Sequence, residues 1–387
     1  MKTTCISSLS KRGAFLACAI LAFAGLGTKA EVGPKLAIKS GESNFSISWS
    51  EKVPGFVLEC ADQLAGAWVS VPGVTGDSAL LSTAAPRQFF RLRNATGTNP
   101  PPDGMRLDYL GQPAPGETPQ VFARGLVSTD EQEHSAPAFS PDGKEVFWWL
   151  NRRSGGGAMM TMRRVGDNWT APTVAPYGGA PAFSPDGQRL YFESSRPTSD
   201  GKADGPYFVE KQGDRWGAQK CGGLVARFPE VQFAYNLSIA SNGTLYFLGY
   251  AAGLGLWNNF GIYRAELLNG EYIKPELLPP GINGPAGTRN WTPYIAPDES
   301  YLIFSSNRGK PSDLNGDLYV CFRQPEGSWT DPVGLGAPIN SIQNERFPAV
   351  SPDGRYLFFT RWTPDHDEDV FWVSAGIIDK LQAKAIH

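Results

Sequence analysis

The sequence predicts an all-β protein: a β-propeller preceded by a small antiparallel β-sandwich domain. Two observations predict the propeller. One turn motif recurs five times in the 387-residue chain, at intervals of 44 to 56 residues, and each copy lies between two short apolar runs. A period of this length is typical of repeat architectures, in which each unit buries its apolar face against its neighbours.

The turn motif has the form Ser-Pro-Asp-Gly or a close variant. Proline presets φ for a turn, aspartate bonds its own backbone and glycine accepts positive φ, so the motif predicts a hairpin between two strands. Aromatic and β-branched residues follow each copy, as in Val146–Trp149 and Leu357–Phe359, and favour strand. The copies lie at 136–143, 180–187, 238–243, 293–298 and 347–354.

A second turn, followed by an aromatic residue, comes later in four of the units. Gly166–Trp169 and Gly213–Trp216 are examples, and an apolar run such as Tyr207–Val209 precedes each turn. Each unit therefore has about four short strands, which is the composition of one propeller blade.

The last unit lacks this second turn, and a segment before the first unit supplies a substitute. Thr118–Ala123 resembles Trp169–Val174. We therefore expect an N-terminal strand to complete the last blade and remove the exposed edges. Residues 106–387 fit five units of about 56 residues, so five blades are predicted; six blades require one long unit to hold a degenerate blade.

The Ser-Pro-Asp-Gly hairpin followed by a strand such as Leu190–Phe192 resembles the TolB-type, WD40-like β-propeller repeat over residues 106–387. Ser241-Asn242-Gly243 departs from the pattern, although Asn-Gly is itself a turn pair. The resemblance implies the fold. It implies little about function, because such repeats occur in binding proteins, peptidase propellers and lyases.

The N-terminus predicts a cleaved secretory signal peptide at 1–30. Basic residues precede an apolar run from Ala14 to Leu26, and Thr28-Lys29-Ala30 is a small-residue cleavage site. We expect a secreted or periplasmic protein without a membrane span, because the run is short. A lipoprotein at Cys18 fits less well, since the apolar run continues past that cysteine.

Charge and cysteine content exclude several classes of protein. The formal net charge is −3 and becomes −7 once residues 1–30, with four basic and no acidic side chains, are removed. No long basic run occurs, which disfavours nucleic-acid binding. Cys60, Cys221 and Cys321 form neither a disulfide framework nor a zinc pattern.

Residues 34–93 predict the separate sandwich domain. Phe45–Trp49 alternates with period two, and the runs Phe56–Glu59, Trp68–Val71 and Phe89–Arg93 follow between turn residues. The pattern resembles modules often fused to secreted bacterial proteins, which implies a role in spacing, attachment or accessory binding. The proline- and glycine-rich segment 94–105 predicts a semi-stiff linker.

The residues just ahead of each turn repeat are the candidate binding site, because they should line one mouth of the central channel. They combine aromatic, amide and charged groups, which suit a carbohydrate or peptide. The alternative is that loop residues are simply polar and that Trp291 packs between blades. The candidates are Tyr177, Tyr235, Asn236, Arg289, Asn290, Trp291 and Arg346.

Two pairs of residues are candidates for catalysis at the same mouth. Glu133 and Glu345 belong to adjacent blades of a closed ring, and paired carboxylates cleave glycosidic bonds. His134 beside Tyr235 offers the base and acid of a lyase. Against both, the chain has three histidines without zinc-ligand spacing and no standard hydrolase or nucleotide motif.

A weak calcium site is the remaining cofactor candidate. Asp313, Asn315 and Asp317 present oxygen ligands at alternate positions, although no complete calcium loop is present and the same residues suit an ordinary turn.

The sequence therefore predicts a propeller that binds a carbohydrate or peptide without chemistry of its own. The alternatives are a glycoside hydrolase or polysaccharide lyase on the same face, and a scaffold for envelope proteins, as the TolB resemblance implies.

Overall fold

The computed structural model divides into two units, Met1–Gly104 and Met105–His387. In the first it describes six strands between residues 36 and 94, and in the second residues 109–193, 205–251, 260–285, 287–309, 315–364 and 367–385. The predicted signal peptide and residues 95–105 of the predicted linker lie outside the described residues.

The first unit contains two three-stranded antiparallel sheets, in the orders β1-β2-β5 and β4-β3-β6. Ile47 in β2 and Leu58 in β3 are fully buried, so each sheet contributes to a core. The strands are β1 (Leu36–Ser40), β2 (Asn44–Trp49), β3 (Phe56–Ala61), β4 (Val69–Ser70), β5 (Ser78–Ser82) and β6 (Phe89–Asn94).

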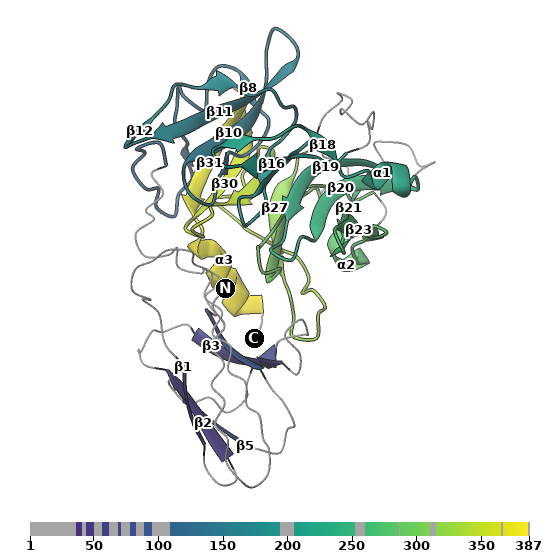
Figure 1. Ribbon diagram of the computed structural model, residues 1–387. Coiled ribbons are helices and arrows are strands. Elements are labelled where there is room, and N and C mark those ends of the chain that lie inside the picture. Colours follow the sequence, from purple (N-terminus) through teal and green to yellow (C-terminus); the bar gives the residue numbers. More distant parts are fainter. Residues whose placement is uncertain are drawn as a thin grey trace. The chain divides into compact units, whose positions relative to one another are not determined.

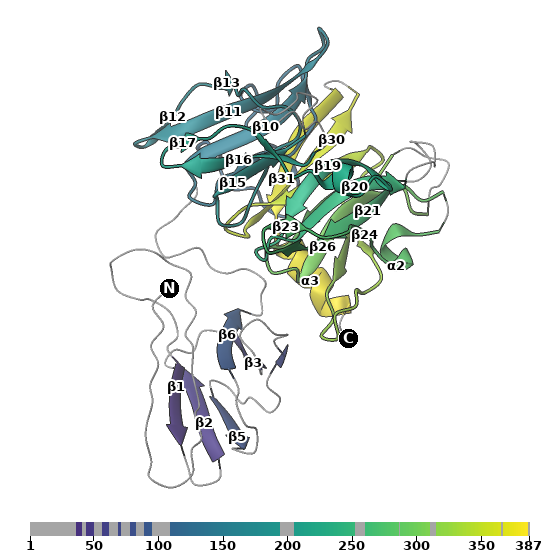
Figure 2. The ribbon, with the colours of Figure 1, turned by 45° about the vertical axis from the view of Figure 1, so that its right-hand side comes forward.

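The second unit is a five-bladed β-propeller (Figures 1 and 2). Five antiparallel sheets follow one another along the chain, each entered at its innermost strand, so the predicted fold and the predicted number of blades are confirmed. The described residues contain no sixth blade.

In blades 1 and 2 the outermost strand is in two parts. The second turn motif joins the third strand of the blade to a short strand that pairs with its end, and a second short strand then pairs with the same third strand further along. Blade 1 comprises β8 (Gln132–Glu133), β9 (Ala138–Phe139), β10 (Glu145–Asn151), β11 (Gly157–Val165), β12 (Asn168–Trp169) and β13 (Thr173–Val174). Blade 2 comprises β14 (Ala182–Phe183), β15 (Arg189–Phe192), β16 (Tyr207–Gln212), β17 (Arg215–Trp216) and β18 (Lys220–Cys221).

Blades 3 and 4 have longer innermost strands. Blade 3 comprises β19 (Val231–Ile239), β20 (Leu245–Ala251), β21 (Phe260–Ala265) and β24 (Glu276–Leu277), with the hairpin β22 (Leu267–Leu268) and β23 (Glu271–Tyr272) beside it. Blade 4 comprises β25 (Asn290–Ile295), β26 (Tyr301–Ser306), β27 (Asp317–Phe322) and β28 (Val333–Gly334).

Blade 5 takes its strands from both ends of the unit. It comprises β29 (Glu345–Val350), β30 (Tyr356–Thr363), β31 (Asp367–Ser374) and β7 (Gln120–Val121). The N-terminal strand β7 pairs with β31 through Val121 opposite Phe371 and Gln120 opposite Trp372. Its residues fall within Thr118–Ala123, the segment expected to complete the last blade.

Hydrogen bonds within the turn motif explain its repetition. In blade 1 the Ser140 hydroxyl donates to Asp142 at 2.6 Å and accepts from the backbone N–H of Glu145 at 2.9 Å. Ser184 and Ser351 make the same contacts with Asp186 and Asp353. The motif therefore has a local, structural role in joining the two inner strands of a blade.

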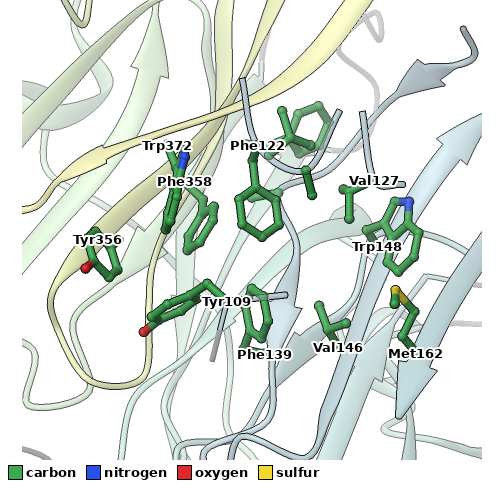
Figure 3. Packing of buried hydrophobic residues seen from close by; sticks show 14 residues of the cluster. Tyr109, Phe122, Val127, Phe139, Val146, Trp148, Met162, Tyr356, Phe358 and Trp372 are labelled. Carbon is green, nitrogen blue, oxygen red and sulfur yellow. The ribbon is translucent and has the colours of Figure 1, made fainter. Parts of the chain in front are cut away.

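Aromatic side chains fill the junction between blades 5 and 1 (Figure 3). Tyr109 and Phe122 precede the first blade, and they pack against Phe139 of β9 and against Phe358 and Trp372 of blade 5. The ring centroids of these pairs lie 5.0 to 6.1 Å apart, a range typical of favourable aromatic pairs. The segment before the first blade thus belongs to the core as well as to the edge.

Three helices complete the described structure: α1 (Leu224–Arg227), α2 (Pro280–Asn283) and α3 (Gly376–Ala385). Buried Ile378 of α3 joins the core shared by blades 4 and 5. Among the residues described, no helix combines the length and apolar character needed to cross a bilayer.

Candidate functional site at the entry face of the ring

Neighbouring innermost strands lie side by side around the ring. β9 contacts β14, β14 contacts β19, β19 contacts β25, and β25 contacts β29. All run in the same direction within a propeller, so their starting residues meet at one end of the ring. We call this end, bordered by His134, Ala180, Asn236, Thr292 and Phe347, the entry face.

Backbone strain marks the entry face. The innermost strands of blades 3, 4 and 5 each contain a bulge, and at each bulge one residue has positive φ: Asn236 at 55°, Thr292 at 50° and Phe347 at 52°. A β-branched or bulky aromatic residue is unfavourable in this region, and such strain often accompanies function. The Phe347 N–H donates to the Thr292 hydroxyl at 3.0 Å and links two of the bulges.

The segments that lead into blades 1, 4 and 5 end in a similar polar anchor. The Asn340 side chain accepts from the Leu318 N–H at 2.8 Å and donates to its carbonyl at 2.9 Å. Asn283 holds both backbone groups of Ile262 in the same way. Ser128 uses its hydroxyl to hold both groups of Val370.

Glu133 and Glu345, the predicted catalytic pair, are matching loop anchors. Glu133 accepts from the N–H and hydroxyl of Thr129, at 3.1 and 2.7 Å. Glu345 accepts from the N–H and hydroxyl of Ser341, at 3.2 and 2.5 Å. Both glutamates are completely buried, so this geometry holds the loops and leaves neither carboxylate facing solvent.

The two anchors differ in their charge partner. Glu345 lies opposite Arg361 on the neighbouring strand and accepts from its Nε at 2.8 Å. Glu133 lies opposite Leu150, and its second oxygen has no hydrogen-bond partner. Burial and, to a smaller extent, the nearby charge of Asp369 raise the pKa of Glu133 to about 8, despite the Thr129 hydrogen bonds.

A fully buried carboxylate, Glu368 of β31, lies at the entry face between blades 5 and 1. His134 Nδ1 lies 2.7 Å from one of its oxygens, and Arg346 Nη2 lies 3.0 Å from both. The Thr360 hydroxyl donates to it at 2.6 Å. Burial alone would raise the pKa of Glu368, but the hydrogen bond from His134 and the charge of Arg346 lower it overall.

The partners of Glu368 reach solvent although Glu368 does not. The His134 side chain is 32% exposed and that of Arg346 is 24% exposed. Trp362 lies directly opposite Glu368 in the β30–β31 pair and is 41% exposed. Since paired residues on antiparallel strands share one face of the sheet, the Trp362 ring and the Glu368 cluster lie on the same face.

The Phe347 ring packs against two members of this cluster, and Arg153 forms an ion pair next to it. The His134 ring meets the Phe347 ring edge-on at a centroid distance of 4.7 Å, and the Arg346 guanidinium lies 5.6 Å from the same ring. Arg153 pairs with Asp367 at 3.1 Å beside it. The cluster is therefore fixed by packing as well as by hydrogen bonds.

Glu193 performs a related role between blades 2 and 3. It accepts from the backbone N–H of Ala180 at 2.8 Å and from that of Asn236. Burial raises its pKa, while those N–H groups and the charge of His134 lower it. Gly179 has φ +72°, and a Cβ there would lie 2.4 Å from the Glu193 carboxylate, so glycine is required.

Two of the remaining predicted ligand residues, Tyr177 and Trp291, pack against other side chains. Tyr177 stacks on Phe192 at 5.1 Å, and burial raises its pKa. Trp291 packs against the cluster of Leu248, Tyr250 and Phe260. Both are partly buried, as the packing alternative describes, and their part in binding stays a prediction.

Three more of these residues lie at the starts of blades 3 and 4. Asn290 is fully buried and donates to the Asn283 carbonyl at 2.8 Å, and the backbone of Arg289 bonds the side chain of Asn307. Asn236 is partly buried. The side chain of Tyr235 is outside the described part of the chain, so its predicted pairing with His134 stays a prediction.

The calcium hypothesis also stays a prediction. Asp313 lies outside the described residues, whereas Asn315 precedes β27 and Asp317 begins it. Within the described ranges, no three histidine, cysteine or acidic side chains gather in a way that would hold a metal ion.

Sequence reasoning missed Glu368, Trp362 and Glu193. Glu368 lies within the acidic run 365–369, and acidic residues in such a run are common in ordinary turns. A usable signal existed in the correspondence between Ser128-Thr129…Glu133-His134 and Asn340-Ser341…Glu345-Arg346. It shows that His134 and Arg346 occupy equivalent positions, from which both reach Glu368.

The protein is a five-bladed β-propeller with a polar, strained entry face. No protein-family model and no curated protein matches the sequence. TolB from Acinetobacter baumannii is similar in structure, with 12% identity, 87% of this chain and 78% of that chain covered, and a TM-score of 0.36.

Two enzymes are similar at the same level. An oligogalacturonate lyase from Vibrio parahaemolyticus shares 10% identity, with 88% of this chain and 96% of that chain covered and a TM-score of 0.35. A gluconolactonase from Xanthomonas campestris shares 13%, with 67% and 97% covered and a TM-score of 0.38. Similarity this distant does not assign a function, which has to come from the site.

Proposed function

We propose that the protein binds a carbohydrate at the entry face, over the Glu368 cluster of blades 5 and 1. The observation that carries the proposal is the exposed Trp362 ring on the sheet face that also carries Glu368, the buried carboxylate that fixes His134 and Arg346. An aromatic face with a few oriented polar groups is the usual composition of a small-ligand site. Pre-organised side chains lose little entropy on binding, which favours affinity.

The N-terminal segment 1–30 supports a further part of the proposal, that this binding takes place in the periplasm or outside the cell. Mass spectrometry of the mature N-terminus after expression with the full leader tests it. A chain that retains residues 1–30 in the cytoplasm would contradict it.

The binding proposal is tested on an array of glycans and peptides, followed by calorimetry with the best glycan. We expect Trp362→Ala to weaken binding at least tenfold. Trp329→Ala is the matched control, because Trp329 is a partly buried tryptophan that forms a β-bridge with Arg323 at the turn-motif end of blade 4. Equal binding by wild type and Trp362→Ala, or binding to peptides alone, would overturn the proposal.

A further inference from the structure

The neutral His134 ring is held in one tautomer by its partner, Glu368. The low pKa of Glu368 keeps that residue a carboxylate, which can only accept, so Nδ1 of His134 carries the proton in their 2.7 Å hydrogen bond. In the neutral ring Nε2 is then the free, basic nitrogen. Nδ1 faces a fully buried group and the His134 side chain is 32% exposed, so we infer that Nε2 is the ring nitrogen that a ligand reaches.

No accessible pair of carboxylates accompanies His134 in the described structure. Glu133, Glu345 and Glu368 are all fully buried, and each is bound to its own loop or partners. Glu193, which also interacts with the charge of His134, is partly buried and binds the backbone N–H groups of Ala180 and Asn236. Hydrolysis by paired carboxylates requires both groups to reach the glycosidic bond from outside. The described site instead offers one exposed base beside one exposed cation, Arg346.

A base next to a cation suits removal of a proton from the carbon that carries a carboxylate. Arg346 binds both oxygens of Glu368 through Nη2, its Nε is buried without a hydrogen-bond partner, and 24% of its side chain is exposed and available to a ligand. An arginine fork pairs well with a ligand carboxylate. Glu368 carries one negative charge that Arg346 and His134 share, so the cluster has a net charge of +1 once His134 gains a proton, and this positive charge stabilises the negative charge that develops on the substrate.

We propose that the entry face cleaves uronic-acid polysaccharides by β-elimination, with His134 as the base. This inference rests on the proposed carbohydrate binding and names its substrate class. Trp362 supports a sugar ring, and Arg346 binds the carboxylate on C5. Nε2 of His134 takes the proton from C5, the C5–H electron pair forms a C4–C5 double bond, and the C4–O bond breaks. His134 then returns the proton to the departing oxygen.

The experiment incubates the full-length protein with polygalacturonate and with alginate and follows the ultraviolet absorbance of the conjugated double bond. Carboxyl-reduced polygalacturonate is the matched neutral substrate and should give no product. We expect His134→Ala to lose on the order of 10²–10⁴-fold in rate, the usual contribution of a general base. It should still fold and bind the substrate, although loss of one partner of the buried Glu368 should lower its unfolding temperature, and added imidazole should restore part of the rate.

A second variant tests positioning. Glu368→Gln removes the carboxylate that fixes the tautomer of His134, so the pH–rate profile should move and not merely fall in height. Uronate binding without any unsaturated product overturns the elimination and leaves the binding proposal standing. Binding restricted to neutral glycans also overturns it, and failure to bind any glycan overturns both proposals.

Discussion

Glu133 should make the protein less stable as the pH rises, and replacing it with glutamine should remove this effect. Its pKa is about 8 in the folded chain against an ordinary value of 4.5. Between these values the folded chain keeps a proton that the unfolded chain has released. The folded state binds more protons there, so stability falls as the pH rises from about 4.5 to about 8 and then levels off.

The size of the effect follows from the pKa values. A difference of about 3.5 pH units at roughly 1.4 kcal/mol each corresponds to about 5 kcal/mol above pH 8, and to about 3 kcal/mol at pH 7. A glutamine side chain in place of Glu133 would still accept the Thr129 hydrogen bonds and would carry no charge beside Asp369. We therefore expect Glu133→Gln to be more stable than wild type by several kcal/mol at pH 9 and by about 1 kcal/mol at pH 5.

The assay is urea unfolding at pH 5, 7 and 9, with equal m-values required for the comparison. Glu345→Gln is the comparison variant, since the same loop motif holds Glu345 and, although burial raises its pKa too, the charge of Arg361 opposes that rise. Removing one member of that buried pair should destabilise the protein by about 3–5 kcal/mol. If wild type and Glu133→Gln show the same dependence on pH, the account of Glu133 is wrong.

Three further predictions concern packing and backbone geometry. Asn340→Ala leaves the N–H of Leu318 without a partner, while its carbonyl keeps the hydrogen bond from the Leu335 N–H. It should destabilise the protein by about 1–3 kcal/mol in urea unfolding, whereas Asn340→Asp, which keeps the acceptor, should lose less. Trp372→Ala opens the blade 5–blade 1 junction and should lower stability by about 3–5 kcal/mol, measured by calorimetry. Gly179→Ala should be clearly more destabilising than Gly111→Ala, because both have positive φ but only the first places a Cβ against Glu193; equal losses would show that the contact is unimportant.

The blades could be predicted from the sequence because their signals are local. Ser-Pro-Asp-Gly determines a turn through hydrogen bonds within five residues, so each copy identifies two strands without knowledge of the rest. The partner of β31 was open to prediction for another reason: Thr118–Ala123 repeats a pattern seen within the first unit. The similarity of the two segments therefore predicted a pairing between strands at opposite ends of the propeller sequence.

The site could not be predicted in the same way, because its groups meet only in the folded ring. Glu368 obtains its role from His134, which lies 234 positions away along the chain. Glu133 and Glu345 look like a catalytic pair in sequence, yet their burial depends on how their loops fold back on Thr129 and Ser341. Glu133 has no basic residue opposite it, because the strand register places Leu150 there, and this register is known only from the structure.

Closure of the ring by β7 has a consequence for folding. The hydrogen bond between Ser128 and Val370 joins residues 242 positions apart. The segment before blade 1 is synthesised first, but it can form this contact only after the last strands of blade 5 have been synthesised. Contacts this distant raise the contact order and slow folding, because loop closure precedes the gain in packing. Because of the same contacts, the folded ring has no free terminal blade that could unfold first, whereas an open array of repeats has one at each end. We therefore expect slow folding together with slow unfolding.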